Sequence, residues 1–358
     1  MSINSSPARR VAVVSNARVF GLSGEAAARS LRESGFDVSH WLMGDGERHK
    51  TLRTAERALA FLSASKLERA DAVVALGGGV VGDVAGFASA LYLRGVACVQ
   101  VPTTLLAQID SSVGGKTGVN TREGKNLVGA FHHPRAVVVD TDTLRTLPAR
   151  ELTAGWCEAV KQGAAGDRRL FDETVRFLED ERRGGGVDVS DDSRAERLAR
   201  LIAAQCAFKA RVVAGDERED VSRADARSRR ILNLGHTVGH ALEAVTLYRR
   251  FRHGEAVGYG LLAAGEISHR LGLLDGSELE SLRRAVRLAG RLPSAAGLDE
   301  DAIIAALGSD KKAVAGSVRW VLLEQLGRAR IVDGREVAPR VVRASLRAAL
   351  RPAIFARE

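Results

Sequence analysis

The most restrictive feature of this sequence is a change in hydrophobic periodicity near residue 150. Before it, short apolar runs rich in β-branched residues alternate with stretches whose apolar residues recur every three or four positions. Such alternation is typical of the strands and helices of a parallel sheet. After it, helical periodicity dominates. The pattern predicts an α/β, Rossmann-like N-terminal domain with a parallel sheet over 1–150 and a mainly α-helical C-terminal domain over 151–358.

The predicted elements follow from the same periodicity. In the first domain we expect strands over 11–14, 72–76, 97–101 and 136–139, and helices over 24–34 and 52–63. In the second we expect helices over 152–165, 195–213, 238–247, 255–271 and 278–289, with a strand pair over 318–323 and 329–332. Three consecutive glycines in 182–192 and the dense alternating charges of 216–230 predict two exposed loops.

Length and composition exclude several classes of protein. A chain of 358 residues with 45% hydrophobic and 27% charged residues has room for two domains and the composition of a globular protein. Its apolar runs are interrupted before the roughly 18 to 20 residues that a membrane span needs, so we expect no membrane partner. The net charge of +9 is spread along the chain and only 4% of residues are aromatic, so we expect no nucleic-acid partner.

The cysteines and the N-terminal residues indicate the compartment. Cys98, Cys157 and Cys206 form an odd set without paired spacing, which predicts reduced thiols. Two arginines near the N-terminus precede a strand-length apolar run without a small-residue cleavage site, unlike a secretory signal. We therefore expect a cytoplasmic protein.

Lysine is scarce in this chain. Eight of the 53 basic residues are lysine, which leaves 53 − 8 = 45 arginines. Because a planar guanidinium cannot replace a compact, rotatable ammonium group, the few lysines are candidate site residues, although chance retention would leave the same number. Lys66 alone is typical of an ordinary surface lysine.

A glycine-rich turn follows the strand predicted over 72–76. Gly77, Gly79 and Gly82 have the spacing GxGxxG at a strand-to-helix junction, where backbone amides can approach a pyrophosphate. A packing role for the glycines would give the same pattern. The acidic residue that usually binds the ribose about 20 residues later is absent from 99–102. The acidic groups of 45–50 could serve the ribose instead.

Two further stretches carry cationic residues. Lys116 and Lys125 stand among glycines and hydroxyls, a setting that suits anionic oxygens but also a solvated loop. Glu158 and Lys161 are three residues apart in a predicted helix, so they share a face, as the partners of a plain ion pair also would.

Three histidines indicate a metal site. His236 and His240 are four residues apart, and His253 stands two residues before Glu255. Histidine combined with carboxylate is typical of zinc or cobalt sites, and three protein ligands leave one position for substrate. Spacing alone nominates His236 and His240 as ligands, while any one histidine could be purely structural.

Several long motifs occur in order: GGGVVGDVAGF, RGVACVQVPTTLLAQIDSSVGGKTGVN, GKNLVGAFHHP, TLPARELTAGWCEAVKQG, NLGHTVGHALEA, HGEAVGYG and SDKK. Together they resemble the 3-dehydroquinate synthases, a family within the sugar-phosphate cyclases. The resemblance extends from about Val11 to Leu323 and implies the dehydroquinate synthase-like fold. It implies the metal ligands Glu158, His236 and His253, and it makes His240 a substrate contact, contrary to the spacing argument.

The resemblance also implies the other site residues. NAD+ contacts are expected from Asp45, Gly46, Glu47, Arg48, His49, Lys50, Gly79, Val80, Val81, Gly82, Asp83, Thr103, Thr104, Lys116, Lys125, Thr143, Leu144, Arg145 and Thr146. The substrate site is expected to contain Asp110, Lys116, Asn126, Lys161, Lys209, Arg229, Asn233, His240, Lys311 and Lys312. Arg94 matches an arginine that reaches the neighbouring subunit's site in the family's homodimer. The link over 220–230 is longer than in the family, so Arg230 is an alternative to Arg229.

The reaction implied is a net lyase reaction, the conversion of 3-deoxy-arabino-heptulosonate 7-phosphate to 3-dehydroquinate and phosphate in the shikimate pathway of aromatic amino acid biosynthesis. It combines transient oxidation by NAD+ beside Zn²⁺ or Co²⁺, phosphate elimination, re-reduction and aldol closure. Three alternatives stay open: a cyclase acting on sedoheptulose 7-phosphate or on an amino analogue, a metal-dependent alcohol dehydrogenase, and a non-catalytic binding protein.

Overall fold

The structure is a computed structural model that describes residues 9–183, 192–223, 225, 228–308 and 318–351. The chain divides into two units, Met1–Thr146 and Leu147–Glu358, each of which is described by itself. The domain limits expected from the sequence, 1–150 and 151–358, and the roles given to those domains stay predictions.

Unit 1 is built on a five-stranded sheet. Its strands are β1 (Arg10–Asn16), β2 (Asp37–Met43), β3 (Ala72–Gly77), β4 (Ala97–Pro102) and β7 (Ala136–Val137). They lie in the order β2-β1-β3-β4-β7, and every neighbouring pair is parallel. The predicted parallel sheet is confirmed, although β7 is shorter than the predicted strand.

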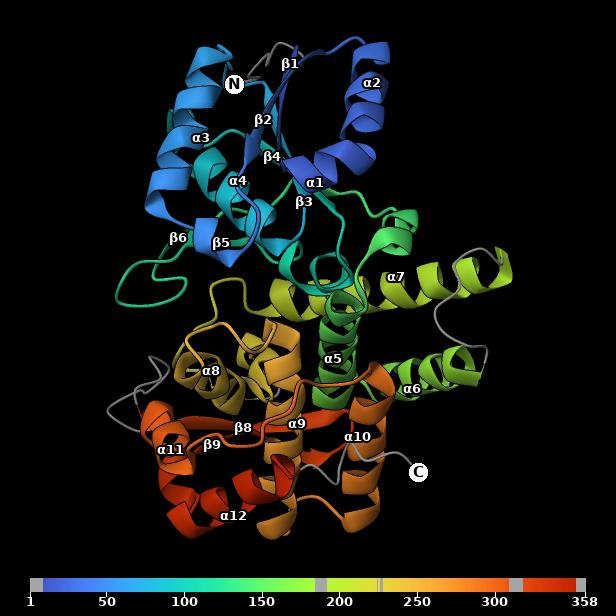
Figure 1. Cartoon of the computed structure of the whole chain (residues 1–358), viewed down its shortest axis with the longest axis vertical. Helices are drawn as coiled ribbons and strands as arrows, with labels where there is room; N and C mark the ends of the chain where they lie inside the picture. The colour runs from blue at the N-terminus through green and yellow to red at the C-terminus, as the bar shows by residue number, and fades with distance from the viewer. Residues whose placement is uncertain (1–8, 184–191, 224, 226–227, 309–317, 352–358) are drawn as a thin grey trace. The chain divides into compact units, whose positions relative to one another are not determined.

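Side chains of the central strands alternate between two apolar layers. Val11 and Val13 face one layer, while Ala12 and Val14 face the other, as the period of two in a strand requires. The first layer is covered by α1 (Ala17–Val19), η1 (Phe20–Gly24) and α2 (Glu25–Glu33), and the second by α3 (Leu52–Ala64) and α4 (Gly79–Leu91), as Figure 1 shows. The sheet is therefore buried on both faces.

The strand order creates a topological switch point at one edge of the sheet. The chain passes from β1 to β2 on one side and then returns to β3 on the other side of β1. Ligands of open α/β sheets bind at such a switch point, outside the carboxyl ends of the strands. The segments that follow these ends are η2 (Glu47–His49), the turn before α4, and η4 (Ala107–Ser111) after β4.

The remaining elements of unit 1 include a hairpin that the sequence did not predict. β5 (Lys116–Val119) and β6 (Val128–Phe131) pair antiparallel. Both strands are four residues long and contain glycine, so they lack a clear strand pattern. Two short helical turns complete the unit, η3 (Tyr92–Arg94) and η5 (Thr141–Thr146).

Unit 2 is mainly helical, as predicted. Its helices are α5 (Ala149–Gly166), α6 (Arg168–Arg183), α7 (Asp192–Gly215), α8 (His236–Val245), α9 (His253–Arg270), α10 (Gly276–Ala289), α11 (Glu300–Gly308) and α12 (Pro339–Ala349). The short turns are η6 (Arg229–Asn233) and η7 (Gly334–Glu336), and β8 (Arg319–Gln325) pairs antiparallel with β9 (Arg328–Asp333).

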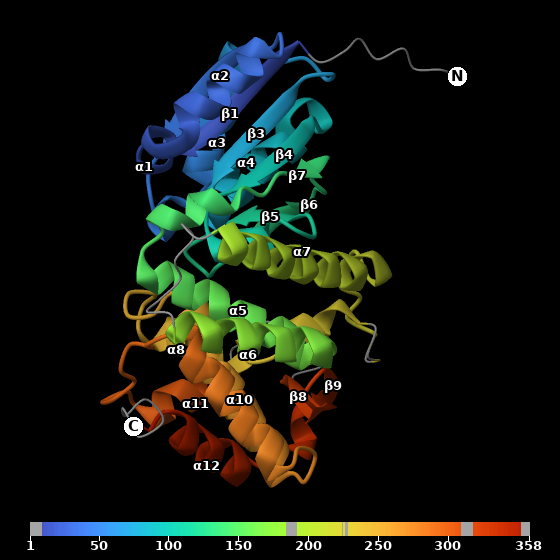
Figure 2. The same ribbon diagram turned by 90° about the vertical axis from the view of Figure 1, so that its right-hand side faces the viewer.

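Helix α9 forms the centre of unit 2. Its residues 254–268 are all buried, and it packs against α5, α8, α10, α12 and β8. Helices α5 and α6 pack side by side and both contact α10 (Figure 2). The helices α6, α11 and α12 were not predicted; α6 and α12 are rich in charged residues, with their apolar positions confined to one face.

The exposed loop predicted over 216–230 is confirmed for most of its described middle residues, such as Glu217, Arg218 and Asp220, and is wrong at its ends. In 216–230, the residues Asp216, Ser228, Arg229 and Arg230 are buried. Asp216 causes this, because its carboxylate accepts backbone N–H bonds from Asp220 and Arg229, both at 2.9 Å, and draws the ends of the segment together. Of the other predicted loop, Arg182 and Arg183 end α6 and Asp192 begins α7, while 184–191 lie outside the described residues.

Two further expectations can be compared with the structure. Cys98, Cys157 and Cys206 are free thiols. Across the residues that the structure describes, none of the helices combines the length and the hydropathy that crossing a bilayer requires.

Candidate functional site

Glycines bring three ligand-bearing segments of unit 2 into close contact. A Cβ atom at Gly254, the second residue of α9, would overlap the carbonyl oxygen of Ala154 in α5. A Cβ atom at Gly260 would overlap the carbonyl oxygen of Gly235, which caps α8 with a φ of 78°. The backbones of α5, α8 and α9 therefore touch where only glycine fits.

These contacts gather a carboxylate and three imidazoles. Glu158 Oε1 lies 3.5 Å from His253 Nε2 and 4.0 Å from His236 Nε2. The His240 ring lies 5.3 Å from the His236 ring and 5.7 Å from the His253 ring, between centroids. One nitrogen from each histidine falls within a group no more than 4.8 Å across. The structure thus brings together the ligand set implied by the resemblance and also the set nominated by spacing, and the choice between them stays a prediction.

The other ring nitrogens of two histidines are already engaged. His253 Nδ1 lies 3.0 Å from Glu243 Oε2, and His236 Nδ1 lies 3.3 Å from the Leu234 carbonyl oxygen. Both partners can accept a hydrogen bond, so in the neutral tautomer that a metal ligand requires, each Nδ1–H would donate to its partner and each Nε2 would carry the lone pair. The two Nε2 lone pairs and Glu158 Oε1 fit a divalent cation of the zinc or cobalt type.

A buried ammonium group accompanies the carboxylate. Lys161 Nζ lies 2.5 Å from Glu158 Oε2, and neither side chain is more than 1% exposed. The two residues are three positions apart on α5, so both project from one face of the helix. The plain surface ion pair considered from the sequence is therefore wrong for these two residues, because the pair is buried.

Two neighbouring groups are not candidate ligands. Glu255 binds the Arg150 side chain through both carboxylate oxygens, at 2.6 and 2.8 Å, and accepts the backbone N–H of Arg252 at 2.7 Å. It therefore caps α9 and ties it to α5. Burial, and then the charge of Glu158, raise the pKa of the Cys157 thiol, so this cysteine stays protonated.

The residues expected to bind the substrate carboxylate lie on α7 and η6. Lys209 and Arg229 are 7% and 4% exposed. Arg229 Nη1 donates to the Glu217 carbonyl oxygen at 2.8 Å, and Asn233 Nδ2 donates to Glu219 Oε1 at 2.8 Å. Helix α7 is joined to α5 beside Glu158, because Gln205 Nε2 donates to the Ala159 carbonyl oxygen at 3.3 Å. Lys311 and Lys312 lie outside the described residues.

The alternative residue Arg230 has a different environment from Arg229. Its Nη1 donates to the Val221 carbonyl oxygen at 3.0 Å. Burial, and then the charge of Arg319, lower the pKa of the Arg230 guanidinium. The positive charge of Arg319, in β8, therefore acts on Arg230.

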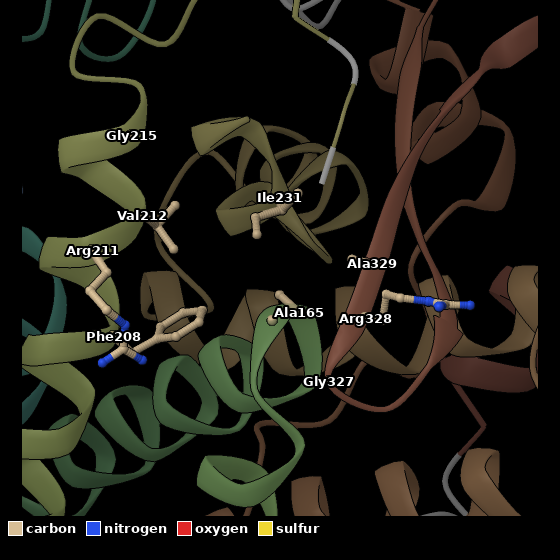
Figure 3. A pocket seen from close by; sticks show the side chains of 10 residues that line it. Ala165, Phe208, Arg211, Val212, Gly215, Ile231, Gly327, Arg328 and Ala329 are labelled. Carbon is tan, nitrogen blue, oxygen red and sulfur yellow. The ribbon is translucent and has the colours of Figure 1, made fainter. Parts of the chain in front are cut away.

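A cavity of about 360 Å³ in unit 2 is separate from the histidine cluster. Figure 3 shows Phe208 and Ile231 beside it, and its lining shares no residue with the cluster. Phe208 precedes Lys209 and Ile231 lies two residues after Arg229, so the cavity borders the segments that carry these cations.

In unit 1, the predicted glycine turn joins β3 to α4. A Cβ atom at Gly79 would lie 2.9 Å from Ser111 Oγ, and one at Gly82 would lie 2.7 Å from Gln100 Oε1. Asp83, one turn into α4, pairs with the buried Lys50, which follows η2. The helix start and the segment after β2 are therefore held together at the sheet edge.

Other predicted NAD+ residues lie at the same edge. Asp45 Oδ1 accepts from Asn16 Nδ2 at 3.3 Å, and Glu47 Oε1 accepts from Asn120 Nδ2 at 2.8 Å and lies 3.8 Å from Lys125 Nζ. The rest are placed as follows: Gly46, Arg48 and His49 lie in or beside η2, Val80 and Val81 in α4, Thr103 and Thr104 after β4, and Thr143, Leu144, Arg145 and Thr146 in η5.

The remaining predicted residues of unit 1 occupy short irregular segments. Asp110 lies in η4, Lys116 begins β5, and Asn126 has a left-handed φ of 52° before β6. Arg94 also has a left-handed φ, 65°, directly after Leu93 at 49°. Two successive non-glycine residues in this region are unusual and cost energy, which is typical of functional segments.

Sequence reasoning missed three residues that support the site. Gln108 Nε2 donates to the carbonyl oxygens of Pro102 and Asp140 and to Thr143 Oγ1, so it joins η4 to η5. Asn16 ends β1 beside Asp45, and Glu243 contacts His253. Only Glu243 had a signal in the sequence, because it extends the spacing of His236 and His240 to i, i+4, i+7 along one helical face.

Solved structures with this fold identify a class of protein. The 2-epi-5-epi-valiolone synthase of Streptomyces hygroscopicus subsp. jinggangensis, solved with NAD+ and Zn²⁺, is 27% identical, with a TM-score of 0.83 over 98% of this chain and 93% of that one. A 2-deoxy-scyllo-inosose synthase complexed with carbaglucose-6-phosphate, NAD+ and Co²⁺ is 25% identical, with a TM-score of 0.78 over 97% and 92%. The fold is therefore that of the sugar-phosphate cyclases.

Sequence comparisons identify the family within this class. Residues 40–154 match the 3-dehydroquinate synthase N-terminal family and residues 155–313 match the 3-dehydroquinate synthase C-terminal family. The 3-dehydroquinate synthase of Pelotomaculum thermopropionicum is 46% identical over 91% of this chain and 84% of that protein, and the one of Nostoc punctiforme is 44% identical over 94% and 88%. The chain belongs to the 3-dehydroquinate synthase family, which confirms the resemblance.

Proposed function

We propose that this protein catalyses the 3-dehydroquinate synthase reaction, in which 3-deoxy-arabino-heptulosonate 7-phosphate gives 3-dehydroquinate and phosphate. As in its named relatives, it would be a carbon–oxygen lyase of the shikimate pathway. The observation that carries the proposal is the convergence of Glu158 Oε1 with the Nε2 atoms of His236 and His253, in a chain 46% identical to a protein of that name.

Glu158, His236 and His253 would hold Zn²⁺ or Co²⁺. Their donor set suits either ion, and related cyclases were solved with one or the other. When bound, such an ion supplies a Lewis acid that polarises a substrate hydroxyl. Lys161 would keep the second oxygen of Glu158 engaged, so that Oε1 alone faces the cation.

NAD+ would bind unit 1 at the switch point of the sheet. Bound NAD+ supplies a hydride acceptor that is restored within each turnover. The amides at the start of α4 would face its pyrophosphate, and the segment from Asp45 to Lys50 would bind its ribose. The Asn16 and Asn120 amides would orient Asp45 and Glu47 for this task.

The chain's own cations would hold the two anionic ends of the substrate. Lys209 and Arg229 would bind the carboxylate, the arginine through its planar fork. We favour Arg229 over Arg230, because the positive charge of Arg319 acts on the Arg230 guanidinium and lowers its pKa. Lys116, Asn126, His240, Lys311 and Lys312 would bind the phosphate and stabilise the charge that develops as it leaves. Asp110, Lys161 and Asn233 would complete the substrate contacts.

The finer expectations about assembly and compartment belong to the same proposal. We infer a homodimer in which Arg94 completes the partner's site, supported by its strained backbone and by exposed apolar side chains nearby, Leu91 and Leu93. Sedimentation of the purified protein as a monomer would contradict it. Three free thiols favour the cytoplasm.

The decisive experiment incubates the pure protein with catalytic NAD+, zinc or cobalt, and one candidate heptulose phosphate at a time. We expect phosphate and a carbocyclic product from the keto acid phosphate. Product from sedoheptulose 7-phosphate or from an amino analogue alone would identify a different cyclase, and net accumulation of NADH would identify a dehydrogenase.

Variants connect this activity to the cluster. Glu158→Gln, or chelation of the metal, should abolish phosphate release and leave the circular dichroism spectrum unchanged. Glu173→Gln is the matched control, because Glu173 is a surface carboxylate paired with Arg169 on α6. Turnover by metal-free protein at the normal rate would remove the metal from the mechanism.

A further inference from the structure

One face of α8 carries more than the two histidines. His236, His240 and Glu243 are spaced i, i+4 and i+7, so the three side chains form one stripe along the helix. Glu243 is only 2% exposed. A buried carboxylate needs a hydrogen-bonding or charged partner, and the His253 ring provides one at 3.0 Å.

The side chain of His253 is less enclosed than that of His236. Its backbone is fixed at the start of α9, where Glu255 caps the helix and Gly254 touches α5. Its side chain is nevertheless 35% exposed, compared with 10% for His236. The rings of His236 and His240 lie 5.1 and 5.7 Å from the His253 ring, between centroids, and the contact with Glu243 adds a hydrogen-bonding restraint on the rotation of the ring about its last torsion.

The two histidines also differ in the group that accepts their Nδ1 proton. His236 faces a neutral carbonyl oxygen at 3.3 Å, whereas His253 faces a carboxylate at the shorter distance of 3.0 Å. A carboxylate acceptor makes the imidazole a stronger electron-pair donor at its other nitrogen. His253 Nε2 is that nitrogen, and it lies 3.5 Å from Glu158 Oε1.

We propose that Glu243 is a positioning residue that sets the metal affinity of the cluster through His253. It accepts a hydrogen bond from Nδ1–H, which fixes the ring tautomer and orientation and strengthens Nε2 as a ligand. The inference rests on the proposed function only in requiring that this cluster binds a divalent cation. A purely structural role, as a tie between α8 and α9, would instead lower stability and leave the metal affinity of folded protein unchanged.

The test measures zinc affinity by competition with a chromophoric chelator, in folded and initially metal-free protein. Glu243→Gln keeps the shape but removes the charge, and Glu243→Ala removes the contact. We expect affinity to fall by about 10- to 100-fold in the alanine variant and by less in the glutamine variant. Glu266→Gln is the matched control, a 3% exposed carboxylate on α9 that pairs with Arg270 and Arg283. It should lower the melting temperature without changing zinc affinity.

A second measurement needs no variant. Nitrogen NMR of the zinc-loaded wild-type protein should show His253 protonated at Nδ1 and metal-bound at Nε2. Zinc affinities of Glu243→Ala and wild type within twofold of each other, or zinc bound at His253 Nδ1, would overturn the inference. If wild-type protein binds no zinc, the metal site of the proposed function fails; if it binds zinc equally well without Glu243, only this inference fails.

Discussion

Replacing Lys161 with methionine should lower the free energy of unfolding, because it leaves the buried Glu158 carboxylate without its ammonium partner. The substitution keeps most of the side-chain volume and removes the ammonium group 2.5 Å from Glu158 Oε2. Both side chains are at most 1% exposed, so water cannot replace the lost partner. Breaking a buried ion pair by removing one member typically costs about 3–5 kcal/mol.

This cost converts to a measurable change in melting temperature. For a unit of 150–250 residues, each kcal/mol lowers the melting temperature by about 2–4 °C, so we expect a fall of about 6–20 °C in metal-free protein. Added zinc should raise the melting temperature of Lys161→Met by more degrees than it raises that of wild type. The reason is that a cation at Oε1 then supplies the positive charge that the carboxylate has lost.

Scanning calorimetry with chelator and with excess zinc is the appropriate assay. Arg169→Ala is the control, because Arg169 pairs with Glu173 at 2.9 Å on the surface, where the arginine side chain is 87% exposed. Exposed ion pairs contribute little to stability, because solvent and salt screen them. A metal-free Lys161→Met protein that melts no lower than Arg169→Ala would refute the reasoning.

Two other substitutions test the framework of each unit. Burial tends to raise the pKa of Asp71, but backbone N–H bonds from Glu68, Arg10 and Arg9 outweigh it, so the pKa lies below the ordinary 3.8. A carboxyl whose pKa is lower in the folded than in the unfolded protein stabilises the fold at pH values above the unfolded pKa. This stabilisation is lost as the pH falls through the folded pKa. Asp71→Asn should therefore destabilise the protein by about 1.5–3 kcal/mol at pH 7. Urea titrations measure the free energy of unfolding of Asp71→Asn and of wild type. If the difference between these free energies did not shrink below about pH 4, this account would be contradicted. Gly260→Ala should lower stability by at least about 1–3 kcal/mol and should also lower zinc affinity. The reason is that its Cβ would overlap the carbonyl oxygen of Gly235, directly before His236. An alanine variant with unchanged zinc affinity would show that this contact does not position His236.

Local patterns predicted the parts of the fold that depend on neighbours in sequence. The β-branched run from Val11 to Val14 predicted a strand, which the structure buries on both faces, and Gly77 to Gly82 marked a strand-to-helix turn. Only the ends of 216–230 were misread as exposed, because Asp216 accepts the backbone N–H of Arg229, which is 13 residues away, and both residues are buried. That contact has no local signature.

The candidate metal cluster shows the same limit. Spacing within one helix could nominate His236 and His240 but could not include Glu158, which comes from α5 and is 78 residues earlier in the chain than His236. Its proximity depends on the contact of Gly254 with Ala154. Only the resemblance to a known family could supply that residue, and the contacts of Glu243 and Gln108 required coordinates.

The glycine contacts among α5, α8 and α9 have a consequence for how such enzymes diversify. At these contacts the backbone of one helix touches the backbone of another, so the distance between the helices does not depend on the side chains around them. Residues that recognise the sugar can then be exchanged while the geometry of the metal-binding residues stays the same. Such a division of labour would let a scaffold acquire new substrates without rebuilding its inorganic centre.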